Sequence, residues 1–193
     1  MQYVRSGCIT GYIYQTHCAP FPALNIKRRN EPVATRAIYS DTATIYSESD
    51  SAQIFVGLHT KYCDVYSMVN DKQIVETLWA VIRKRGAMDK LISNHAQLEV
   101  SKKVKDILLH LSIDDWQLEP HIQQKIFVEK SYRDIKPKVN LVLNSMGAPL
   151  NTRLLWMEYV CFVINHTAVQ SLNWRTPYKC LEDQTRDIYD HLG

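Results

Sequence analysis

The segment Lys90–Glu129 constrains the fold of this chain more than any other, because it alternates short strands with helical patterns. The apolar pair Leu91 and Ile92 predicts a short strand that ends in Ser-Asn-His, and a helical pattern follows it. A second short strand is expected around Trp116. The sequence Glu-Pro-His then leads into a helical pattern that carries Glu129. This alternation predicts a sheet flanked by helices.

Periodic patterns in the rest of the chain complete the predicted order. Three successive runs with short connections suggest an antiparallel meander: Ala37–Tyr39 with its neighbours, Ala52–Leu58 and Tyr62–Val69. The helical patterns are Asn70–Arg85, Ser101–Leu111, Gln123–Met146 and Leu150–Ala168. The order β-β-β-α-β-α-β-α-α predicts an α/β fold with a mixed five-stranded sheet. Pro137 should kink or split the third of these helices. Three tryptophans are expected in the core: Trp79, Trp116 and Trp156.

A chain of 193 residues is long enough for one domain with its own core. We divide it into an irregular N-terminal arm at 1–32, a core domain at 33–175 and a C-terminal tail with a short helix at 176–193. The charged content of 22% is ordinary for a soluble globular protein. The most apolar run, Leu154–Ile164, is too short to span a membrane and contains Glu158, so we expect no membrane partner.

The cysteines and the basic clusters are weak signals when each is taken alone. The five cysteines lack CxxC spacing, which indicates reduced thiols in an intracellular protein of the nucleus or cytoplasm. A zinc site at Cys8, His17 and Cys18 matches no common finger spacing and is disfavoured. The basic clusters are Lys27–Arg29, Arg83–Arg85, and Lys102 and Lys103 with Lys105. Each cluster alone favours a solvated surface over a nucleic-acid patch.

Seven segments in consistent order resemble the integrase region of Ty1/copia-type retrotransposon polyproteins, and they look most like the copia-like elements of diatoms and related algae. The segments are FPALNIKRRNEPVATRAIYSDT, AQIFVG, IRKRGAMDKLIS, KVKDIL, IDDWQLEPH, GAPLNTRLLWMEYVCFVINHT and SLNWRTPYKCL. The resemblance covers about Phe21 to Ile188. It implies the ribonuclease-H-like fold of integrases, with DNA (element ends and target) as the partner and a possible homo-oligomer.

The resemblance also implies a catalytic site for DNA strand transfer. In the family, three carboxylates hold two divalent metal ions, magnesium or manganese. Their positions correspond here to Arg36, Asn94 and Glu129, so only Glu129 keeps its carboxylate. Arginine has a fixed positive charge and no acceptor, and asparagine has no negative charge. We therefore expect no metal cofactor in this copy, and we expect Arg36 to form a salt bridge with Glu129.

Two other acids are candidate replacements for the lost carboxylates. Asp41 lies five residues after Arg36, so it points to the opposite face of the same strand unless the strand bulges. Asp64 is near in the meander, but we favour a polar residue at a strand edge. His95 after the fourth strand is a further candidate ligand, for which an exposed loop histidine is the favoured interpretation.

The helix that carries Glu129 also has a predicted nucleic-acid-binding face. Glu129, Arg133 and Lys136 fall on one side of a helix, at i, i+4 and i+7. The candidate binding residues are Lys125, Lys130, Arg133 and Lys136. Such a face would bind phosphate in a salt-dependent way. The alternative is a solvated helix face with an ordinary Glu–Arg pair.

Three functions remain open from the sequence. The first is an active integrase core that transfers DNA strands, which the loss of two carboxylates argues against. The second is a nucleic-acid-binding pseudoenzyme that keeps the basic face. The third is a decayed element fragment with no selected role. We predict an integrase-like core with a broken catalytic triad and no catalysis.

Overall fold

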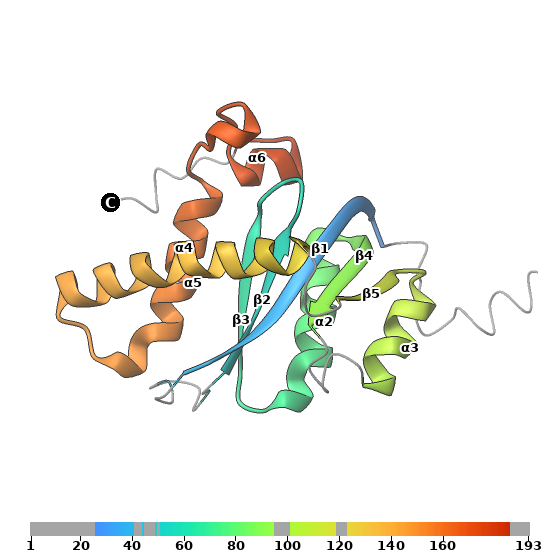
Figure 1. Cartoon of the computed structure of the whole chain (residues 1–193), viewed down its shortest axis with the longest axis horizontal. Helices are drawn as coiled ribbons and strands as arrows, with labels where there is room; N and C mark the ends of the chain where they lie inside the picture. Colours follow the sequence, from blue (N-terminus) through green and yellow to red (C-terminus); the bar gives the residue numbers. More distant parts are fainter. Residues whose placement is uncertain are drawn as a thin grey trace, which may run out of the picture.

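Within the described residues, five strands form one mixed sheet with helices on both faces (Figure 1), as the computed structural model of the chain shows. The structure describes residues 26–40, 44, 49, 51–94, 101–118 and 123–185. The strands are β1 Arg28–Tyr39, β2 Ser51–Gly57, β3 Cys63–Met68, β4 Ala87–Asn94 and β5 Asp114–Leu118. Their order in the sheet is β3-β2-β1-β4-β5. The first three strands pair antiparallel, and β4 and β5 pair parallel to β1, which confirms the predicted α/β fold with a mixed sheet.

The helices connect the strands and then pack back on the sheet. They are α2 Ile74–Arg85, α3 Lys102–His110, α4 Gln123–Met146, α5 Arg153–Asn165 and α6 Pro177–Glu182. Short 3-10 turns precede three of them: η2 Asp71–Gln73, η3 Leu150–Thr152 and η4 Gln170–Leu172. Gly86 ends α2 with φ of 97°, and a Cβ there would overlap the carbonyl oxygen of Lys27. Only glycine fits this close approach between the end of α2 and the start of β1.

Successive strand residues alternate between two cores, one on each face of the sheet. On β1, Val33 faces α2 and α3, whereas Ala34 faces α4 and α5. The core under α2 and α3 includes Val33, Phe55, Met68, Leu78, Leu91 and Leu108. The core under α4 and α5 includes Ala34, Ile54, Ile92, Ile135, Val139 and Val160. The same alternation places Arg36, two residues after Ala34, on the α4 face.

Helix α4 runs through Pro137 without a break, so the predicted split is wrong. Figure 1 shows it crossing over β1 as one helix. Proline removes the hydrogen bond to the carbonyl oxygen of Arg133, four residues earlier. Both residues lie on the exposed side of α4, where water can satisfy that carbonyl group. The buried side, with Ile135 and Val139, holds the helix on the sheet.

Three sequence predictions need correction. Strand β1 begins at Arg28, inside the predicted irregular arm at 1–32, so the first strand starts earlier than the boundary at 33. Trp116 is exposed and not in the core, and the ammonium group of Lys90 lies 4.3 Å from the centre of its ring. The last long helix ends at Asn165 and not at Ala168. The division into arm, core and tail stays a prediction.

Cys63, Cys161 and Cys180 carry free thiols, as predicted. Cys8, His17 and Cys18 lie outside the described residues. In the part of the chain that the structure describes, no helix has both the length and the apolar character needed to cross a bilayer.

Candidate functional site

Strand β1 and helix α4 bring Arg36 and Glu129 together, as predicted. Arg36 Nη1 lies 3.6 Å from Glu129 Oε1, and both side chains are about one-third exposed. The guanidinium carbon of Arg36 also lies 5.6 Å from the centre of the Tyr132 ring, one turn further along α4. Arg36 therefore contacts an anion and an aromatic face on the same helix.

The second oxygen of Glu129 has a partner on its own helix. Arg133 Nη2 lies 3.8 Å from Glu129 Oε2, in the i, i+4 arrangement expected from the sequence. Arg133 is 78% exposed, so this contact contributes little to stability. Its effect is electrostatic, because a guanidinium group now lies beside each oxygen of the carboxylate.

Asn94 is the last residue of β4, where its backbone is level with Leu118 of β5. The parallel pairing of β1 with β4 aligns Ala34 with Ile92. Continuing that register by two residues puts Asn94 level with Arg36 on the neighbouring strand. The backbone thus gathers the three predicted positions at one region of the sheet, with Glu129 above it on α4.

The residues present do not fit a divalent metal ion at this position. Two unit charges 4 Å apart interact by about 4 kcal/mol at an effective dielectric constant of 20. A dication held by Glu129 would meet twice that repulsion from Arg36. Among the described residues, no cluster of three His, Cys, Asp or Glu side chains lies close enough together to hold a metal ion.

Asp64 cannot replace the lost carboxylates, because it lies on the other face of the sheet. It pairs across β2 and β3 with Phe55, whose side chain belongs to the core under α2 and α3. Its carboxylate is buried and occupied: Arg85 Nε lies 2.6 Å from Oδ2, and Lys84 Nζ lies 2.8 Å from Oδ1. Asp64 is thus a polar residue on β3, the edge strand of the sheet, as predicted, although its side chain is buried. Asp41 and His95 lie outside the described residues.

Three of the predicted binding residues form an exposed basic face on α4. Lys130, Arg133 and Lys136 are all exposed and lie within two turns of one another. Lys125 belongs to the first turn of α4, and the structure describes only its backbone. Within two turns of one helix, this face concentrates positive charge next to Arg36.

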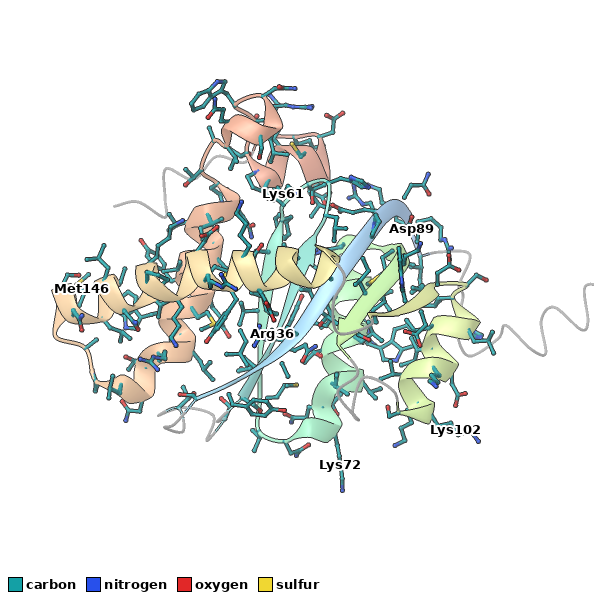
Figure 2. All side chains as sticks on the ribbon, viewed as in Figure 1. Arg36, Lys61, Lys72, Asp89, Lys102 and Met146 are labelled. Atoms are coloured by element: carbon teal, nitrogen blue, oxygen red, sulfur yellow. The ribbon has the colours of Figure 1, made fainter. Side chains whose placement is uncertain are left out.

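Lys61 on the β2–β3 turn adds a further positive charge near Lys130, and no sequence pattern predicts it. Figure 2 shows Lys61 at that turn, where its Nζ donates a hydrogen bond to the carbonyl oxygen of Leu58 at 2.7 Å. Burial lowers the pKa of Lys61; the Glu31 carboxylate opposes that shift, and the nearby Lys130 ammonium group adds to it. A single lysine in a turn has no periodic pattern, so only the three-dimensional structure reveals its neighbour.

Comparisons with known proteins identify the fold. No protein-family model matches the chain, and no curated protein sequence matches it. The HTLV-2 integrase catalytic core domain in complex with magnesium superposes with a TM-score of 0.61 at 13% identity, covering 79% of this chain and 97% of that one. The BIV integrase catalytic core domain superposes with a TM-score of 0.61 at 12% identity, covering 85% of this chain and 98% of that one. A chain of the simian T-cell lymphotropic virus intasome in complex with PP2A regulatory subunit B56 gamma superposes with a TM-score of 0.64 at 13% identity. The match covers 84% of this chain and 58% of that one.

These neighbours and the strand order define a ribonuclease-H-like domain. Within that class, the fold is similar to that of retroviral integrase catalytic cores. At 12–13% identity the likeness concerns the fold.

Proposed function

We propose that this chain is an integrase-core-like domain from a copia-type retrotransposon. The domain binds nucleic acid and no longer performs metal-dependent strand transfer. The contact between Arg36 and Glu129 carries this proposal, because it replaces a metal-binding geometry with an ion pair. The seven segments that resemble diatom and algal copia-like elements support the origin. The proposal places the protein inside the cell, in the nucleus or cytoplasm.

Loss of the metal ions would remove the chemistry but not the binding surface. In a two-metal site, the ions activate the attacking oxygen and stabilise the leaving one. One structural neighbour, the HTLV-2 integrase core, was solved with magnesium. The present chain has a guanidinium group at one of the corresponding positions and an amide at another. We infer that neither magnesium nor manganese binds here.

Nucleic-acid binding is favoured over a purely solvated helix face by the convergence of cations from two elements. Lys130, Arg133 and Lys136 come from α4, and Lys61 comes from the β2–β3 turn. Like charges held close together destabilise a protein unless an anion joins them. At Lys61, burial is the main cause of the lowered pKa and the Glu31 carboxylate opposes it; the smaller repulsion from Lys130 is the part that a bound phosphate would relieve.

The triple substitution Lys130→Gln, Arg133→Gln, Lys136→Gln should weaken binding to a 20-base-pair duplex and flatten its salt dependence. Each phosphate contact contributes about 0.9 to the slope of log K against log salt concentration, so the slope should fall by roughly 2–3. Fluorescence anisotropy between 50 and 200 mM salt measures both quantities. The matched control is Lys102→Gln, Lys103→Gln, Lys105→Gln on α3, which removes the same charge from another exposed helix.

If the α3 control loses as much affinity as the α4 variant, the binding follows net charge and the α4 face has no special role. If the unaltered chain does not bind the duplex even at 50 mM salt, the result favours a decayed fragment with no selected role. A manganese-dependent nick produced by the unaltered chain would favour the active integrase.

We also propose that α5 joins two copies of the chain. Most residues of this helix are apolar, and Leu155, Tyr159 and Val163 form an exposed stripe at i, i+4 and i+8, with the exposed Glu158 beside it. The HTLV-2 integrase core was solved in both trimeric and dimeric forms. Tyr159→Lys should shift a dimer to a monomer in light scattering at micromolar concentration, whereas the exposed Leu109→Lys on α3 should not. A monomeric unaltered chain at 100 µM would exclude the α5 interface.

A further inference from the structure

The fold brings together two basic clusters that are more than fifty residues apart in the sequence. Lys27–Arg29 leads into β1, and Arg83–Arg85 ends α2 just before β4. Because β1 and β4 are parallel, both strands begin at the same end of the sheet (Figure 1). Ala87 N donates a hydrogen bond to the carbonyl oxygen of Lys27 at 2.8 Å, and Arg29 Nε donates one to the carbonyl oxygen of Arg85 at 2.9 Å. Taken alone, each cluster was expected to be solvated surface; together they form one site.

A surface pocket of about 340 Å³ lies between the two clusters. Its basic lining residues are Lys27, Arg29, Arg83, Lys84 and Arg85. Glu182 of α6 is the acidic residue of the lining. The wall is therefore strongly cationic, and its volume is large enough for a phosphate group with its water molecules.

Some of these charges are already neutralised inside the protein. Arg29 Nη2 lies 2.9 Å from Glu182 Oε1. Lys84 and Arg85 both contact the buried carboxylate of Asp64. The single carboxylate of Asp64 balances only one of these two charges, so one positive charge remains from this pair besides those of the other two basic residues.

Lys27 and Arg83 supply most of the unneutralised charge. Both side chains are exposed, and no ion pair joins either of them to another described residue. An ammonium and a guanidinium group at the rim of one pocket match the chemistry that binds phosphate. Gly86 also lines the pocket, and its missing Cβ lets the two cluster-bearing segments lie close together.

We propose that this pocket binds a phosphate group of nucleic acid, as a second contact at the far end of the sheet from Arg36 and Glu129. Nine residues of extended β1 separate Lys27 from Arg36, which is about 30 Å at roughly 3.3 Å per residue. A duplex rises 3.4 Å per base pair, so contact with both regions needs about nine base pairs or more. The pocket itself stands independently of the proposed function, whereas the identity of the polymer rests on it.

The test compares Lys27→Gln, Arg83→Gln with the control Lys102→Gln, Lys105→Gln, which removes two charges from the exposed face of α3. Inorganic phosphate is the first probe, and its binding is detected by changes in the amide chemical shifts of the protein. Phosphate should shift the amide signals of Gly86 and Ala87 in the unaltered chain and the control, but not in the pocket variant. Duplex affinity at 100 mM salt should fall by about tenfold or more in the pocket variant and by much less in the control.

The α4 triple variant separates this inference from the proposed function. If it loses duplex binding but keeps the phosphate-dependent shift at Gly86, the pocket is real and independent of the α4 face. Absence of any phosphate-dependent shift at Gly86 in the unaltered chain overturns the pocket. Equal duplex affinity in the pocket variant and its control overturns nucleic acid as the source of the phosphate. Unchanged amide spectra away from the substitutions show that the glutamine variants remain folded.

Discussion

Asp64→Ala should lower the free energy of unfolding by about 3–5 kcal/mol. The Asp64 and Arg85 side chains are 5% and 3% exposed, and their nearest atoms lie 2.6 Å apart. Arg85 Nη2 also donates to the carbonyl oxygens of Phe55 and Tyr62, each at 3.1 Å, so the guanidinium group cannot easily leave the interior. Without Asp64 a positive charge stays buried and uncompensated, which is the costly case for a buried pair. Equilibrium unfolding in urea measures the loss.

Two further variants show whether the cost comes from the orphaned charge. Asp114→Ala removes an exposed acid from β5 and should change stability by less than about 0.5 kcal/mol. The double variant Asp64→Leu, Arg85→Met removes both charges and should recover much of the stability lost by Asp64→Ala. If the double variant is less stable than Asp64→Ala, the pair stabilises the fold directly. A loss no greater than that of Asp114→Ala would contradict a buried ion pair at this position.

Local patterns predicted the elements well because their signals are close together in the sequence. The bounds of α4 agree with the prediction, since an apolar stripe marks its buried side and Gly147 follows its end. The helical pattern predicted from Ser101 also matches α3, where Ser101 is the N-cap and its Oγ accepts a hydrogen bond from Val104 N at 3.4 Å. Both features depend on residues within a few turns of one another.

Pairings across the fold could not be predicted from such patterns. Asp64 and Arg85 are twenty-one residues apart, and nothing in the sequence of β3 shows that this acid faces α2. The two basic clusters around the pocket became one site only when β1 and β4 proved to be parallel neighbours. Lys61 was missed for the same reason. The contact of Arg36 with Glu129 was predicted, but from a family resemblance and not from periodicity.

The double reversion Arg36→Asp, Asn94→Asp should restore binding of manganese and produce manganese-dependent nicking of a labelled duplex. The substitutions return two negative charges and remove the guanidinium group that opposes a metal ion. A partly exposed ion pair such as Arg36–Glu129 stabilises a fold by only about 0–1 kcal/mol, so its loss should leave the domain folded. Metal binding at one hundred times the dissociation constant would raise the stability of the reverted chain by about 2.7 kcal/mol. Thermal unfolding with and without manganese detects that gain without any assay of activity.

Nicking by the reverted chain should exceed that of the unaltered chain by about a hundredfold or more, because each 1.4 kcal/mol of transition-state stabilisation is a tenfold change in rate. Adding Glu129→Gln to the reversion should abolish both the metal-dependent stabilisation and the nicking, since it removes the one retained carboxylate. Each single reversion should remain inactive. If manganese stabilises the reverted chain and no nick appears, the metal site is restored and the catalytic loss lies elsewhere. If manganese does not stabilise the reverted chain, the assignment of the metal-binding positions to residues 36, 94 and 129 is wrong. Equal nicking by the unaltered and reverted chains would also contradict that assignment.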